Sequence, residues 1–134
     1  MGEEEMVETT LTDDMIKSGA ELVRRLDEGR LQPDAAFWLY SPELQEWKLV
    51  IVEVKLERQG PREIYKEIQN VMSHAKDDLG SLSLDSVTLA KPDSPVVSIL
   101  RTAIRTGDGI SGIRFTNNVI NGTLVEDAYI YRLT

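Results

Sequence analysis

Two carboxylates and one amine occur at a spacing that could support metal-assisted chemistry. Asp34 follows Pro33, and after 18 intervening residues Glu53 and Lys55 stand two apart in a segment rich in β-branched residues. Residues two apart on a strand share one face of a sheet, so we expect Glu53 and Lys55 to project to the same side. Hard divalent cations require oxygen ligands, and a bound cation polarises a phosphate and acidifies its water.

The register of a predicted β-hairpin decides whether these side chains meet. If Tyr40 pairs with Trp47 across a short polar turn, the numbers of paired residues sum to 87, and Asp34 lies opposite Glu53. A slip of one residue would place Asp34 opposite Val54 and separate the two carboxylates. In the first register a carboxylate pair lies beside an amine.

Pro33-Asp34 and Glu53-Val54-Lys55 resemble the signature of the PD-(D/E)xK nuclease superfamily, and the resemblance covers about residues 13–90. It implies a magnesium-dependent nuclease that cleaves phosphodiester bonds. Asp34 and Glu53 would bind Mg²⁺, and Lys55 would position or activate water. The family core has a further strand between its first helix and its aspartate strand, for which residues 29–32 leave no room.

The same residues also have a purely structural explanation. Asp34 would follow a proline at the start of a strand, and Glu53 and Lys55 would form the solvated end of an otherwise apolar strand. Charges at such a position discourage edge-to-edge aggregation of sheets. On this hypothesis the chain has no catalytic site and needs no cofactor.

The elements that must position these residues follow from hydrophobic periodicity and from the placement of glycine and proline. They give the order α-ββ-α-β-α-ββ, which predicts an α+β fold with a mixed, mainly antiparallel sheet, helices packed on it and a C-terminal β-hairpin. We expect helices over 13–28, from 61 to about 78 and from 95 to Gly107, and strands over 35–40, 47–56, 87–90, 113–120 and 123–133.

The last two strands should be joined at Asn121-Gly122. This dipeptide favours positive φ at both central positions, as a type I′ hairpin turn requires. Asn117-Asn118 is a competing turn, but the alternation of apolar residues on both flanking strands favours the later one. Tyr129 and Tyr131 share one side of the last strand. They would form an interaction or dimer surface if that strand is a sheet edge, and core if it is not.

Composition limits the classes of function. The 134 residues contain no cysteine and carry a net charge of -8. Residues 1–90 carry 10 Lys/Arg and 19 Asp/Glu, a balance of -9, and residues 91–134 carry 5 and 4, a balance of +1. An acidic surface repels phosphate backbones, so nucleic-acid binding is disfavoured. No apolar run approaches the length of a membrane span, and the acidic start does not resemble a secretory signal, so we expect a cytoplasmic protein without a membrane partner.

Two hypotheses from different functional classes follow. We expect residues 1–9 to be an acidic flexible tail and residues 10–134 to form a single domain. The first hypothesis is a small acidic, non-catalytic interaction or regulatory protein, which binds another protein or self-associates. The second is the magnesium-dependent nuclease that uses Asp34, Glu53 and Lys55.

Overall fold

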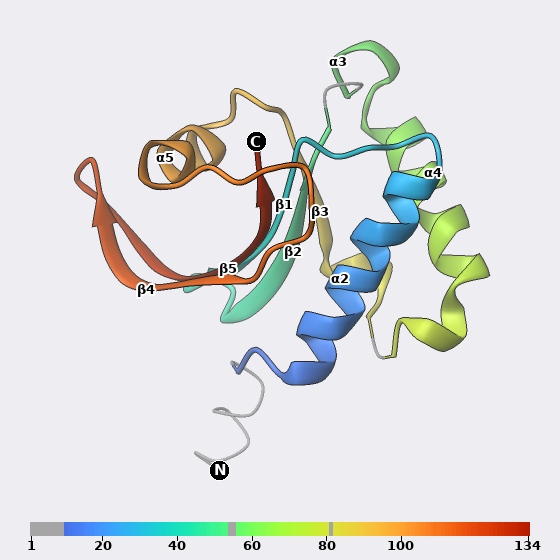
Figure 1. Ribbon diagram of the computed structural model, residues 1–134, viewed down its shortest axis with the longest axis horizontal. Helices are drawn as coiled ribbons and strands as arrows, with labels where there is room; N and C mark the ends of the chain where they lie inside the picture. The colour runs from blue at the N-terminus through green and yellow to red at the C-terminus, as the bar shows by residue number, and fades with distance from the viewer. Residues whose placement is uncertain (1–9, 54–55, 81) are drawn as a thin grey trace.

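A five-stranded mixed sheet forms the centre of the computed structural model, which describes residues 10–53, 56–80 and 82–134 (Figure 1). Its strand order is β3-β2-β1-β5-β4, with β2 and β3 parallel and every other pair antiparallel. The α+β prediction is therefore confirmed, while the predicted tail over 1–9 lies outside the described residues. The strands are β1 (Ala35–Ser41), β2 (Glu46–Val52), β3 (Val87–Ala90), β4 (Ile113–Ile120) and β5 (Thr123–Leu133).

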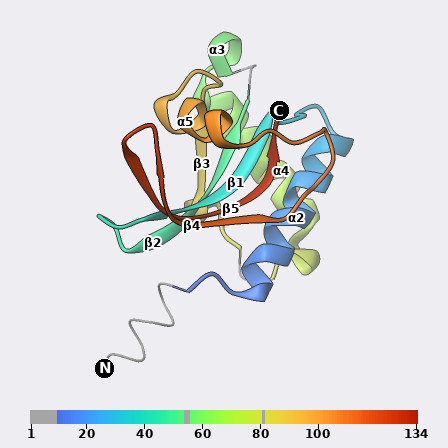
Figure 2. The same ribbon diagram turned by 60° about the vertical axis from the view of Figure 1, so that its left-hand side comes forward.

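Helices cover both faces of this sheet (Figures 1 and 2). Thr12 caps the first of them by accepting a hydrogen bond from the Met15 amide at 3.1 Å. Pro61 occupies the first turn of the second helix, where a backbone N–H would have no partner within the helix, so the missing N–H of proline costs no hydrogen bond. Helices α2 (Asp13–Glu28) and α4 (Pro61–His74) pack on one face, and α5 (Pro95–Ala103) packs on the other; α3 (Leu56–Gln59) and the 3-10 turns η1 (Lys76–Asp78) and η2 (Leu84–Ser86) are short connections.

The β1–β2 hairpin has the predicted register. Tyr40 pairs with Trp47 and Ala35 with Val52, so paired residue numbers sum to 87 throughout. The second strand is shorter than predicted, because β2 ends at Val52 and α3 begins at Leu56. Alternate residues of both strands pack into two different cores, one under α2 and α4 and one under α5, so a slip of one residue would exchange the two sets of core residues.

The face toward α2 and α4 carries the larger core. Trp38, Trp47 and Tyr131 bring rings from three strands, and Leu22, Leu26, Ile64 and Ile68 cover them from the two helices. Gly19 lies where α2 crosses these rings, and a Cβ at this position would collide with the Tyr131 hydroxyl. Glycine is therefore needed in α2 to let the helix approach the sheet closely.

The C-terminal hairpin turns at Asn121-Gly122, with φ of 50° and 80° at the two positions, which confirms the type I′ prediction. Asn117 also has a positive φ, 52°, although it lies inside β4. The pairing is interrupted between Thr116 and Asn118, and beyond this point the inward-facing residues change parity from Phe115 to Ile120. The residue of the competing turn therefore bends the hairpin, whose end curls around α5 (Figure 1).

The two edges of the sheet differ. Edge strand β3 has four residues, and the Tyr65 hydroxyl from α4 donates to Val87 O at 3.4 Å and accepts from Leu89 N at 3.2 Å. One side chain thus satisfies two backbone groups on the side of β3 that faces away from β2. Edge strand β4 has eight residues and mostly exposed side chains. Blocking one edge with a side chain prevents further strand pairing there.

Candidate functional site

The structure places Asp34 and Glu53 at the same end of the β1–β2 hairpin. Asp34 directly precedes β1 and its amide donates to Val52 O at 3.0 Å; Glu53 directly follows β2 and its amide donates to Ala90 O at 3.3 Å. By strand alternation both belong to the face that packs against α2 and α4. Lys55, the third predicted site residue, lies outside the described residues.

The two carboxylates differ in their access to solvent. Asp34 is half-buried and lines a cavity of about 340 Å³ together with Asp27, Asp108 and Arg132. Glu53 is 2% exposed and is not among the residues that line this cavity. Within residues 10–53, 56–80 and 82–134, no three His, Asp or Glu side chains are grouped so that they could hold a metal ion together. The proposed Mg²⁺ ligands therefore share one end of the sheet without sharing this cavity.

Arg132 is the centre of that cavity wall, and it was not predicted from the sequence. The residue is 5% exposed, and its guanidinium donates to both Asp27 carboxylate oxygens, at 2.9 and 2.6 Å. It also donates to Pro33 O at 3.0 Å and to Gly109 O at 3.3 Å. The hydrogen bonds to Asp27 raise the pKa of Arg132, so the side chain stays charged. The only signal in the sequence was a charged residue at the end of an apolar strand.

These contacts explain how the start of β1 is held. Arg132 lies on β5, Asp27 on the last turn of α2 and Pro33 immediately before Asp34. The Thr134 amide and hydroxyl both donate to Asp34 O, at 3.2 and 2.7 Å. The backbone of Asp34 is thus held by hydrogen bonds on both sides. The contacts of Arg132 are all within the protein, so a structural role is enough to explain its burial.

Tyr131 is buried in the core, and Tyr129 is half-buried. Strand β5 lies between β1 and β4, so it is not a sheet edge. Tyr131 is 1% exposed, and its hydroxyl donates to Ile16 O at 2.5 Å and accepts from Trp38 Nε1 at 2.9 Å. Burial raises the pKa of Tyr131, so its hydroxyl remains a donor. The half-buried Tyr129 ring lies edge-on to it at 5.5 Å.

Exposed apolar residues gather instead at the end of the β4–β5 hairpin. Val119 and Leu124 pair directly across the two strands and are 69% and 58% exposed. Nearer the base, Arg114 lies 5.5 Å from the Trp47 ring centroid and donates to both oxygens of Asp127, at 2.6 and 2.7 Å. The hairpin thus has a rigid base and an apolar end, which we call the hairpin tip (residues 118–125).

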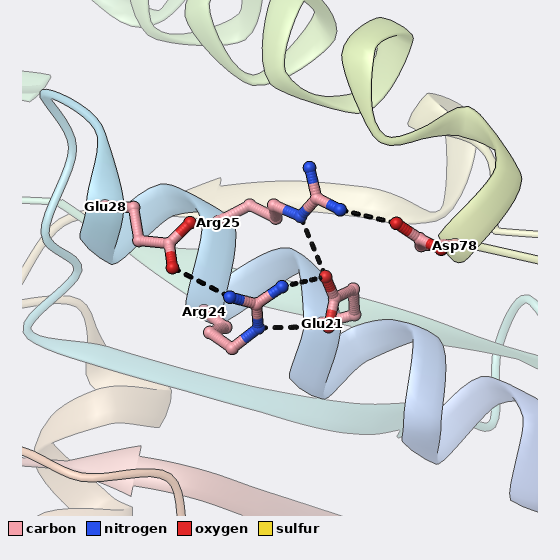
Figure 3. Close-up of polar contacts among 5 residues, drawn as sticks. All are labelled: Glu21, Arg24, Arg25, Glu28 and Asp78. Atoms are coloured by element: carbon pink, nitrogen blue, oxygen red, sulfur yellow. Dashed lines mark hydrogen bonds and ion pairs between the residues drawn. The ribbon is translucent and has the colours of Figure 1, made fainter.

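An ion-pair network ties α2 to the turn after α4 (Figure 3). Glu21 accepts hydrogen bonds from both Arg24 and Arg25, and Arg24 also reaches Glu28 at 2.7 Å. Arg25 continues to Asp78 at 2.5 Å, 53 residues further along the chain. The hydrogen bonds from Arg24 and Arg25 lower the pKa of Glu21 to about 2. All five side chains take part in the network, which links α2 to the turn η1.

The part of the chain that the structure describes includes no helix with the length and apolar composition needed to cross a bilayer. No family model matches the chain, and comparisons with curated proteins and with solved structures found no match.

Proposed function

We propose that this chain is a non-catalytic interaction protein that self-associates through strand β4 and the hairpin tip. The observation that carries the proposal is the directly paired Val119 and Leu124, both more than half exposed, beside an eight-residue edge strand. Exposed apolar side chains scattered singly are ordinary, whereas a cross-strand pair at a sheet edge offers a contact to another strand.

The charge distribution favours this surface over the rest of the molecule. Residues 1–90 carry a balance of -9 and residues 91–134 a balance of +1, so two copies meet little repulsion where the C-terminal hairpins face each other. Along β4 itself the only charged residue is Arg114, and Asp127 pairs with it. Two acidic chains can therefore approach through this region.

The two sheet edges support the same conclusion. Tyr65 occupies the outward groups of β3, whereas β4 is longer and no described element pairs with its outer side. An antiparallel pairing of β4 with β4 of a second copy would bury the hairpin tips around a two-fold axis. Such an interface uses the same patch on both subunits.

Sedimentation equilibrium over a concentration series tests this function. Wild-type protein should reach twice the chain mass of 15.1 kDa. Leu124→Asp should weaken dimerisation at least tenfold, because each dimer would then bury two unpaired carboxylates. Leu44→Asp is the matched control, since Leu44 is 62% exposed in the β1–β2 turn, and it should leave dimerisation unchanged. A wild-type chain that stays monomeric at about 1 mM, a concentration at which even weak pairs with Kd near 1 mM associate, would contradict the proposal.

A second candidate is the magnesium-dependent nuclease, which one observation favours. The β1–β2 register, continued by one residue beyond Ala35 and Val52, brings Asp34 opposite Glu53. Metal-dependent cleavage of DNA or RNA, lost in both Asp34→Asn and Glu53→Gln but kept in Glu126→Gln, would support this function. Cleavage that survives Glu53→Gln, or no cleavage of single- and double-stranded substrates with Mg²⁺ or Mn²⁺, would reject it.

A further inference from the structure

The two strands of the C-terminal hairpin change sides at one point along their length. In a regular strand, consecutive side chains project to opposite faces of the sheet. Thr116 and Asn117 are consecutive in β4, yet both line a cavity of about 270 Å³ beside Trp47. Glu126 and Asp127 are consecutive in β5 and line the same cavity. Both strands therefore exchange their inward and outward sides at this position.

This exchange decides which apolar residues of the hairpin are covered. Phe115 and Ala128 pair across the strands and pack into the core under α5. Regular alternation from this pair would also turn Val119 and Leu124 inward. Instead Val125 is inward and 5% exposed, whereas Leu124 is 58% exposed. The apolar pair of the hairpin tip is thus exposed because the strands change sides.

Asn117 is the residue at which the change occurs. Its φ of 52° is left-handed, and the ladder with β5 is interrupted here, between Thr116 and Asn118. Asparagine adopts this conformation more readily than most residues that have a side chain, whereas a β-branched residue in it is strained. Irregularities of this kind re-aim the side chains of an edge strand. The backbone of one residue therefore accounts for the exposure of the tip.

We propose that Asn117 is a positioning residue for self-association, because its left-handed backbone turns Val119 and Leu124 outward. With a regular backbone at residue 117, Ile120 and Val125 would face outward instead. Each of these two pairs with a polar residue, so the outward face would lack an apolar cross-strand pair. The effect on dimerisation rests on the proposed function, whereas the exposure of the side chains can be measured in the monomer.

Thiol labelling measures this exposure cleanly, since the chain contains no cysteine. Leu124→Cys and Val125→Cys are prepared as separate variants and reacted with a water-soluble maleimide in dilute solution. The Leu124→Cys protein should react about tenfold faster, in line with exposed fractions of 58% and 5% at the two positions. Adding Asn117→Val to each should reverse this order. An unchanged order in folded Asn117→Val proteins would overturn the proposal.

Two control variants separate the left-handed backbone from other effects. Asn117→Gly removes the side chain but allows positive φ, so it should keep the wild-type order of reactivity. Glu126→Val places the same β-branched side chain beside the same cavity on β5, where φ is not positive, and should also keep it. A reversed order in either control would overturn the assignment to the backbone of Asn117. Melting curves verify folding, and Asn117→Thr replaces Asn117→Val if that variant is unfolded.

Sedimentation equilibrium then tests the effect on self-association. Asn117→Val should weaken dimerisation about tenfold, as expected when the burial of a large apolar side chain is lost, and Asn117→Gly should not. If Asn117→Val reverses the labelling order but dimerises like the wild type, Asn117 does not position the tip for self-association. If the wild type itself stays monomeric, the proposed function fails, and the labelling order still decides whether Asn117 sets the exposure of the tip.

Discussion

Replacing Asp27 by alanine would remove the carboxylate that pairs with the buried Arg132. The guanidinium would lose two short charged hydrogen bonds, at 2.9 and 2.6 Å, and keep the carbonyl groups of Pro33 and Gly109. Breaking a fully buried ion pair costs about 3–5 kcal/mol. The Asp27 side chain is 31% exposed, so water can partly replace it, and we expect a loss of about 2 kcal/mol in the free energy of unfolding.

Urea denaturation followed by tryptophan fluorescence measures this loss, since Trp38 and Trp47 lie in the adjacent core. A loss of about 2 kcal/mol should also lower the melting temperature by about 8 °C in a domain of this size. Asp108→Ala is the control, because Asp108 lines the same cavity but acts on Arg132 only through space. That variant should change stability by less than about 0.5 kcal/mol.

A double-mutant cycle separates the ion pair from other effects of the substitution. In the Arg132→Met background no buried charge remains, so Asp27→Ala should then cost much less than it does in the wild type. If Asp27→Ala leaves stability within about 0.5 kcal/mol of the wild type, water solvates Arg132 well enough that the pair does not hold α2 to β5. Equal losses in both backgrounds would also refute the reasoning.

Three further predictions concern a turn, an ion-pair network and a sheet edge. Gly122 has a φ of 80°, so Gly122→Ala should reduce stability by about 1 kcal/mol in urea denaturation, whereas Gly107→Ala, where φ is not positive, should not. Arg24 and Arg25 lower the pKa of Glu21 to about 2, so its stabilising effect is complete above about pH 4.5 and is lost as the pH falls toward 2. The stability difference between wild type and Glu21→Gln should therefore shrink over that range, and a constant difference would contradict this. Tyr65→Phe removes both hydrogen bonds to β3, so it should cost about 1–2 kcal/mol and accelerate amide exchange at Leu89; unchanged exchange would mean that the hydroxyl does not protect the edge.

Local patterns were sufficient to predict the hairpins. The pairing of Tyr40 with Trp47 followed from a short polar turn between two strands, and Asn121-Gly122 determined the second turn through its preference for positive φ. Both signals depend only on residues close together in the chain. Asn117-Asn118 was recognised as a possible turn, and Asn117 does have a positive φ, but it lies inside β4, where it interrupts the pairing without ending the strand.

Long-range pairings were not predictable in the same way. The alternation of apolar and polar residues along β5 does not indicate that this strand lies between β1 and β4. In this position Tyr131 is part of the core, and Arg132 reaches Asp27, which is 105 residues earlier in the chain. The helix α4 also ends at His74, whereas the sequence predicted about residue 78, because residues 76–78 form a 3-10 turn. For the candidate site, the predicted register places Asp34 and Glu53 at one end of the hairpin. The burial of Glu53 could not be predicted, because it depends on packing between elements that are distant in the sequence.

The tyrosine that closes the β3 edge has a consequence for stoichiometry. A sheet with two open edges could add copies at both ends, and raising the concentration would lengthen the assembly without limit. Because the Tyr65 hydroxyl is hydrogen-bonded to the outward backbone groups of β3, β4 is the one edge strand of each copy, among the described strands, that is open to pairing. The proposed self-association through β4 would therefore end at two copies, and higher concentration would increase the number of pairs rather than their size.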